Sequence, residues 1–213
     1  MKPVHLVTPF GAGTGSDTVR RVLAAALSKY LGQPVVVDNR PGAGEVLAAQ
    51  TVAKAAADGY TLLSATNAIL FVKYIQPDIG YDPIADFAPV TTTSVAGQVL
   101  TVRTDSPAMR VEDLVALAKA SPGKLNYGSG GMGSPPHLAA AAFQAVSGIK
   151  VMHVPFKGPT ETPLAVLRGD VDYFFGAYGN IQPHLATGKM RALAVTNAAR
   201  NTQLPRCRRC AKC

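Results

Sequence analysis

PFGAGTGSD, residues 9–17, joins a short apolar segment, 4–8, to a long stretch of helical periodicity. A glycine-rich loop that leads onto a helix N-terminus presents backbone N–H groups and the positive end of the helix dipole, and both attract anions. Apolar residues at helical spacing indicate the helix and predict one buried face, made of Val19, Val22, Leu23, Ala26, Leu27, Tyr30 and Leu31. The sequence therefore predicts a site for a small negatively charged group at this loop.

The composition is that of a globular protein. The 213 residues are 47% hydrophobic and 16% charged, and no apolar run approaches the roughly 18 residues of a membrane span. The formal net charge is +8, with four basic residues crowded near the C-terminus at 206, 208, 209 and 212. A basic chain of this kind suits acidic small molecules. Nucleic acid is disfavoured, because aromatic residues are only 7% of the chain and are not interleaved with the basic ones.

The N-terminal sequence and the positions of the cysteines bear on where in the cell the protein works. No hydrophobic leader precedes the first predicted strand, so we expect either a cytoplasmic protein or a chain that begins at its mature end. Residues 1–206 contain no cysteine, which excludes a disulfide framework for the body of the protein.

Strand-like and helix-like segments alternate along the chain, which predicts an α/β fold with a largely parallel sheet. The pattern restarts near residue 102 and so indicates a second domain. Each domain carries one glycine-rich loop before a helix, and we expect the ligand in a cleft faced by both loops. The predicted strands are 4–8, 35–38, 61–64, 88–92, 98–102, 125–127, 150–154, 171–175 and 191–195, and the later helices are 45–57, 111–120, 137–146, 163–168 and 181–187.

The second loop, GSGGMGSPP at 128–136, also fits the dinucleotide fingerprint G-x-G-x-x-G through Gly128, Gly130 and Gly133. That interpretation expects an acidic residue about twenty positions further on to hold the ribose. The stretch 149–156 offers only Lys150 and His153. A dinucleotide-dependent enzyme is therefore kept only as an alternative.

No other catalytic constellation is present in the sequence. There is no G-x-S-x-G, no Walker lysine and no H-E-x-x-H motif. The four histidines, His5, His137, His153 and His184, share no metal-ligand spacing. We therefore expect no enzyme activity, no cofactor and no metal.

Longer motifs extend along almost the whole chain. They are VVVDNRPGAGE (35–45), AADGYTLL (56–63), LVALAKASPGKLNYGSGGMGSPPHLAA (114–140), VMHVPFKG (151–158), LRGDVDYFF (167–175) and HLATGKMRALAVT (184–196). In this order they resemble the Bug family, the TctC-like solute-binding proteins of tripartite tricarboxylate transport systems. The resemblance implies a periplasmic, two-domain binding protein of the Venus-flytrap, type II-like kind. It implies capture of a small organic carboxylate for delivery to membrane transporter subunits, with no catalysis, no nucleic acid and no membrane insertion.

The resemblance also implies the ligand-binding residues. In the first domain they are Phe10, Gly11, Gly13, Ser16, Asp17, Ser64, Thr66 and Asn67, and in the second they are Ser129, Gly130, Gly133, Ser134, Lys157 and Gly158. Some of these have plainer interpretations. Ser16 is also a suitable N-cap and Asp17 a suitable first-turn acid, and Lys157 is also explained as a solvated loop lysine.

The C-terminal end departs from the family pattern, which continues after LAVT with a block that completes the first domain. We therefore expect an incomplete first domain at 1–101 and 197–205, a second domain at 102–196, and an atypical basic tail at 206–213. The tail holds Cys207, Cys210 and Cys213, fewer thiols than the four ligands of a structural zinc site. A frameshift after Pro205 explains such a tail, and a non-functional fragment remains the second alternative.

Overall fold

The computed structural model describes residues 2–156, 158, 160–197, 204, 208 and 209. The chain divides into two compact units, Met1–Thr91 (unit 1) and Thr92–Cys213 (unit 2). The sequence pattern placed this division at residues 101 and 102. The contacts place it earlier because strand β4, Gln98–Arg103, pairs along its length with two strands of unit 2. Leu204, expected in the first domain, packs against a core of unit 2.

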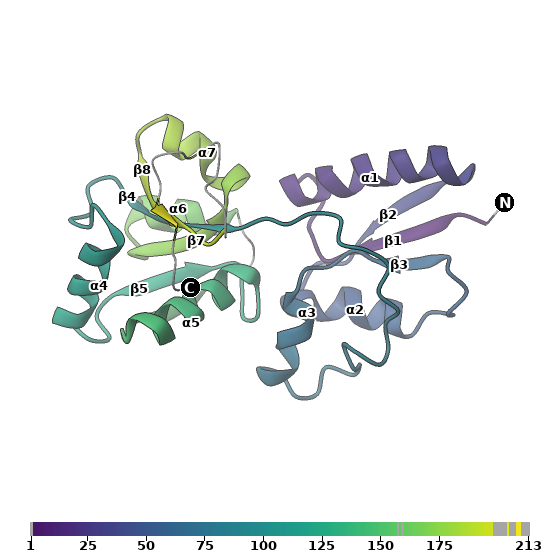
Figure 1. Ribbon diagram of the computed structural model, residues 1–213, viewed down its shortest axis with the longest axis horizontal. Coiled ribbons are helices and arrows are strands. Elements are labelled where there is room, and N and C mark those ends of the chain that lie inside the picture. Colours follow the sequence, from purple (N-terminus) through teal and green to yellow (C-terminus); the bar gives the residue numbers. More distant parts are fainter. Residues whose placement is uncertain (1, 157, 159, 198–203, 205–207, 210–213) are drawn as a thin grey trace. The chain divides into compact units, whose positions relative to one another are not determined.

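Unit 1 is built on a three-stranded parallel sheet in the order β2 (Val35–Asn39), β1 (Val4–Thr8), β3 (Thr61–Leu63). Leu6 in the central strand pairs with Val37 on one side and Leu62 on the other. Figure 1 shows helix α1, Gly15–Leu31, and helix α2, Val46–Ala53, on the two sides of this sheet. The remaining elements are the 3-10 turn η1 (Ala43–Glu45), the short helix α3 (Ala68–Phe71) and the 3-10 turn η2 (Val72–Tyr74).

The buried face of α1 differs from the prediction. Val22 and Tyr30, expected in the core, are 67% and 88% exposed, whereas Asp17, Arg20 and Ala24 are buried. Polar contacts set this rotation, since Asp17 and Arg20 bond to loops at the strand ends and the Ser28 hydroxyl accepts the N–H of Val35. The predicted apolar face was therefore wrong for Val19, Val22, Ala26, Tyr30 and Leu31, all of which are exposed.

Unit 2 contains a six-stranded mixed sheet. Its order is β6 (Met152–Pro155), β5 (Asn126–Ser129), β7 (Tyr173–Ala177), β4, β8 (Met190–Val195) and β9 (Arg208–Arg209). β5 pairs in parallel with β6 and β7, but β4 runs antiparallel to both β7 and β8. The expectation of a largely parallel sheet is therefore wrong for β4. Its helices are α4 (Val111–Ala120), α5 (Pro135–Ser147), α6 (Glu161–Arg168) and α7 (Tyr178–Ala186).

Side chains that alternate between the two faces of the unit 2 sheet form two hydrophobic cores. Tyr173 and Phe175 in β7 belong to one hydrophobic cluster, and Phe174 between them belongs to another. Because successive side chains of a strand point to opposite faces, these clusters cover the two faces of the sheet. Helices α4 and α5 supply Leu114 and Phe143 to the first cluster.

The segment 88–97 joins the two units without forming a helix or strand. A strand was expected at 88–92, and this expectation is wrong. Val90, the β-branched apolar residue of the expected strand, is 82% exposed and therefore has no sheet to pack against. In the part of the chain that the structure describes, no helix is long and apolar enough to cross a membrane.

Candidate functional site: two glycine-rich loops

The first loop is held by the carboxylate of Asp17. Its Oδ2 accepts the Gly13 N–H at 2.9 Å and the Arg21 Nε–H at 2.8 Å, and its Oδ1 accepts the Asn39 amide at 2.8 Å. The hydrogen bonds from Arg21, Asn39 and Gly13 lower the pKa of Asp17 to about 2. Asp17 thus ties the loop to α1 and to the end of β2 while remaining charged.

The N-cap of α1 is Thr14. Its hydroxyl accepts the N–H of Asp17 at 3.2 Å and donates to the Gly11 carbonyl at 2.9 Å. The plainer interpretation of Ser16 as the N-cap is therefore wrong, since Ser16 lies inside the helix. The Gly15 and Ser16 N–H groups belong to the first helical turn, which has no intrahelical acceptors for them.

The loop after β3 is held by Glu45. Its two carboxylate oxygens accept the backbone N–H of Thr66 at 2.9 Å and the Thr66 hydroxyl at 2.6 Å. Glu45 is 8% exposed, and burial raises its pKa. Its φ of 81° lies in the left-handed region that favours glycine, so the chain keeps a strained backbone where it gains these contacts.

Arg20 lies among the predicted site residues, and the sequence reasoning did not include it. Arg20 is 9% exposed, and its guanidinium lies over the ring of Phe10, 4.7 Å from the ring centroid. Nε donates to the Ser64 hydroxyl at 3.2 Å, and a terminal nitrogen donates to the Ser16 carbonyl at 3.5 Å. The structure thus brings Phe10, Ser16 and Ser64 together around Arg20. The available signal was the spacing from Asp17, because residues three apart share a helix face.

The second loop is held together at Gly131, whose carbonyl accepts hydrogen bonds from the hydroxyls of Ser129 at 3.0 Å and Ser134 at 2.7 Å. Gly131 and Gly133 have φ values of 120° and 76°, which side chains disfavour. The Gly133 N–H is already donated to His137 Nδ1 at 3.2 Å. Gly130 lies between Ser129 and Gly131 and is half-buried.

Two histidines lie behind this loop. His153 Nε2 and the buried Ser129 Oγ are joined by a 2.6 Å hydrogen bond, and the His153 and His137 rings lie 4.4 Å apart. The Tyr127 ring stacks on His153 at 4.8 Å. Burial, together with the neighbouring His137, lowers the pKa of His153 to about 4, and burial lowers the pKa of His137. Both imidazoles are therefore neutral near pH 7 and serve as hydrogen-bonding groups.

The remaining predicted residues have simpler placements. Asn67 is exposed just before α3, and Gly158 is half-buried after β6. Lys157 lies outside the described residues, as do Cys207, Cys210 and Cys213. The first glycine of the dinucleotide fingerprint has a packing role, since a Cβ on Gly128 would lie 2.7 Å from Thr162 Cγ2. Within the described residues, no group of three metal-ligating side chains comes together.

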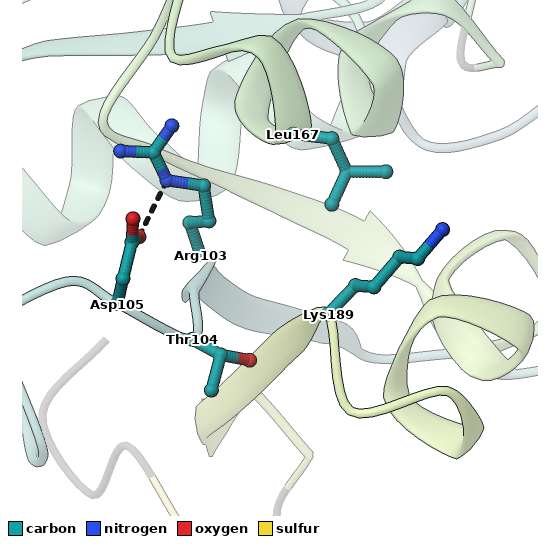
Figure 2. Close-up of a pocket in the computed structure, with 5 residues that line it drawn as sticks. All are labelled: Arg103, Thr104, Asp105, Leu167 and Lys189. Carbon is teal, nitrogen blue, oxygen red and sulfur yellow. Dashed lines mark hydrogen bonds and ion pairs between the residues drawn. The ribbon is translucent and has the colours of Figure 1, made fainter.

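Surface depressions are lined by residues outside the two loops, and one of them includes Asn39, which bonds to Asp17 and to the Phe10 carbonyl. Figure 2 shows one in unit 2, where Arg103, Thr104, Asp105, Leu167 and Lys189 surround an open pocket and Arg103 pairs with Asp105. Another, in unit 1, is lined by Asn39, Arg40, Pro41, Leu47, Gln50, Thr51 and Lys54. Neither is lined by residues of the second glycine-rich loop.

Comparisons with known proteins agree with the motifs. Residues 19–212 match the model of the tripartite tricarboxylate transporter family receptor. The chain is 37% identical to protein BugT of Bordetella pertussis over 209 residues, covering 96% of this chain and 63% of BugT. It is 36% identical to the UPF0065 protein in the gbd 5' region of Cupriavidus necator over 204 residues, covering 96% of this chain and 62% of that protein. The chain thus spans less than two thirds of the length of these curated relatives.

Comparison with solved structures agrees with the sequence matches. R. palustris Rpa4515 with adipate superposes with a TM-score of 0.86 at 35% identity, covering 98% of this chain and 70% of that one. MatC (Rpa3494) from Rhodopseudomonas palustris with bound malate gives 0.83 at 30% identity, covering 97% and 71%. An ancestral arginine-binding protein, at 15% identity and a TM-score of 0.60, shares the fold alone. The predicted α/β binding-protein fold is confirmed.

Proposed function

The chain belongs to the tripartite tricarboxylate transporter receptor family, as its motifs predicted, and we propose that it binds a small organic carboxylate without transforming it. One observation carries the proposal: each unit places a glycine-rich loop between a parallel strand and a helix N-terminus, at 9–14 and at 130–134. Such loops hold anions with backbone N–H groups and helix dipoles and need no catalytic side chain. Relatives solved with adipate and with malate support this ligand class.

The proposed binding groups are those that the loops leave open. In unit 1 they are the first-turn N–H groups of α1, with Phe10 and Ser64 at the ends of β1 and β3. Both donors of Thr66 are already held by Glu45. In unit 2 the proposed group is the Gly130 N–H, because the hydroxyls of Ser129 and Ser134 already donate to the Gly131 carbonyl. Asp17, Gly13 and Gly133 are proposed to shape the loops, because their groups form hydrogen bonds within the protein.

The family also suggests the setting. We propose that the protein works in the periplasm and delivers its ligand to the membrane subunits of a tripartite transporter. Periplasmic relatives such as BugD, at 30% identity and a TM-score of 0.79, support this assignment.

A ligand screen tests the function. Adipate, malate and a panel of mono- and dicarboxylates are added to the folded protein, and thermal shift and calorimetry are measured. A true ligand at a hundredfold excess over its Kd should stabilise the protein by about 2.7 kcal/mol. Nicotinamide nucleotides in the same screen address the dinucleotide alternative. A folded sample that responds to no carboxylate would rule out the proposed function.

A pair of glycine variants locates the site. Gly130→Val adds a branched side chain beside the Gly130 N–H and should weaken carboxylate binding by about 100-fold, because hydrogen bonds to a charged group are lost. The matched control is Gly179→Val, at an exposed α7 position where a Cβ meets nothing within 4 Å. Unchanged affinity in Gly130→Val would place the ligand elsewhere.

A further inference from the structure

A buried polar cluster lies beneath the first loop. It consists of Arg20 in α1, Glu45 before α2, Ser64 and Thr66 after β3, and Tyr81, and we call it the Arg20 cluster. Arg20 and Glu45 are close enough for their charges to affect each other's pKa, and the Glu45 charge also acts on Tyr81. The cluster lies at the carboxyl ends of β1 and β3, the edge where open parallel sheets bind ligands.

Arg20 is buried, and no carboxylate of the described residues is in direct contact with it, although the Glu45 charge acts on it from a distance. A buried cation is strongly unfavourable unless it is paired and hydrogen-bonded. Within the described part of the chain no carboxylate forms an ion pair with Arg20, and burial lowers its pKa. Nε and one terminal nitrogen have oxygen acceptors, while the second terminal nitrogen has none among the described residues and is not one of their fully buried unpaired atoms.

Glu45 does not neutralise Arg20 by direct contact. Both of its carboxylate oxygens accept hydrogen bonds from Thr66, which directs the carboxylate toward the loop after β3. The Tyr81 hydroxyl, also buried, has no hydrogen-bond partner among the described residues. The cluster therefore contains an Arg20 N–H group that described protein atoms leave free, and an acidic group from outside the protein is a suitable acceptor for it.

We propose that Arg20 is a ligand-binding residue of unit 1, whose guanidinium binds one acidic group of the ligand, and that Glu45 positions Thr66 beside it. The proposal rests on the proposed carboxylate-binding function and adds to it. It makes Arg20 a specificity-determining residue, because a guanidinium distinguishes a carboxylate from an amide of the same shape. The ligands that bind best should then carry a second acid group in addition to the one held by backbone N–H groups.

The test compares a diacid with its half-amide. Adipate and adipic acid monoamide have nearly the same shape and differ by one negative charge. Calorimetry should show that the wild type prefers adipate, or whichever diacid binds in the screen, over its monoamide. Arg20→Gln should weaken diacid binding by about 10- to 100-fold and should abolish the preference over the half-amide. Lys29→Gln, which removes a charge from an exposed position of the same helix, should leave both affinities unchanged.

A structural role for Arg20 gives a different result. If Arg20 only supports the fold, Arg20→Gln weakens diacid and half-amide equally, and the preference survives, which would overturn the proposal. Should Arg20→Gln fail to fold, the wild type still decides by NMR. The Arg20 Nε–H resonance, assigned with Arg20→Lys, should move on addition of the diacid and much less with the half-amide, and equal movement overturns the proposal. A wild type that binds no carboxylate at all would instead overturn the proposed function.

Discussion

Among single residues, Glu45 shows how a local strain is retained for a distant contact. Its positive φ is disfavoured for a side chain by about 1–2 kcal/mol, and its carboxylate holds both donors of Thr66. Ala43, in the same 3-10 turn, also has a positive φ of 48°. The turn therefore positions the loop after β3 while two of its residues keep an unfavourable positive φ.

Two substitutions separate the strain from the contact. Glu45→Ala should destabilise unit 1 by about 2 kcal/mol, because the Thr66 donors lose their acceptor while the strain remains. Glu45→Gly loses the same contact but relieves the strain, so it should be more stable than Glu45→Ala by about 1 kcal/mol. Urea unfolding measures both. An alanine variant equal to or more stable than the glycine variant would contradict a strained backbone at this position.

His153 makes the stability of unit 2 depend on pH. Its pKa is about 4 in the folded protein and 6.5 in a free side chain, so the unfolded chain binds the extra proton first as the pH falls. The contribution of neutral His153 to the free energy of unfolding is therefore complete above pH 6.5, and it is lost progressively between pH 6.5 and pH 4.

The pH dependence is testable with one variant and one control. His153→Gln keeps an amide that can bond to Ser129 but does not titrate, so its melting temperature should fall less steeply than that of the wild type between pH 6.5 and pH 4. His184→Gln, in α7 of the same unit, should follow the wild-type slope. Identical slopes for wild type and His153→Gln would exclude His153 as the source.

Among the elements, α1 shows what the sequence could and could not predict. Its position and its glycine-rich approach follow from local signals, and so do helices such as α4, whose predicted bounds, 111–120, are those observed. The orientation of α1 does not follow from local signals, because Arg20 and Asp17 bond to Ser64 and Asn39, which are distant in sequence. The antiparallel direction of β4 and the polar partners of Glu45 were missed for the same reason.

The orientation of α1 predicts which of its positions tolerate change. Val22→Ser, on the face that is 67% exposed at this residue, should change the free energy of unfolding by less than about 0.5 kcal/mol. Ala24→Leu, at a residue that is 4% exposed, should destabilise by about 1–3 kcal/mol through overpacking. Chemical denaturation compares the two. A larger loss for Val22→Ser would support the buried face that the periodicity predicted.

At the scale of the whole molecule, the chain is two units joined by the segment 88–97. That segment has no helix or strand and is almost entirely exposed. Proteases cut native proteins first at exposed backbone that forms no helix or strand hydrogen bonds.

Limited digestion checks this division. Thermolysin cleaves before large apolar residues, so the first cut in native protein should fall between Ser94 and Val95, where Val95 is 88% exposed. Mass spectrometry should then show fragments 1–94 and 95–213 before any others. An earlier cut within α1 or β4 would mean that these elements open more easily than the joining segment.

The separation of the cores has a calorimetric consequence. Among the described residues, each hydrophobic cluster draws its members from one unit only. Heat absorption need not then follow a single all-or-none transition, and the calorimetric enthalpy should exceed the van't Hoff enthalpy. A ligand held by one unit would shift only that unit's heat-absorption peak, and a ligand held by both would shift both peaks. Scanning calorimetry can therefore report whether one unit or both take part in binding.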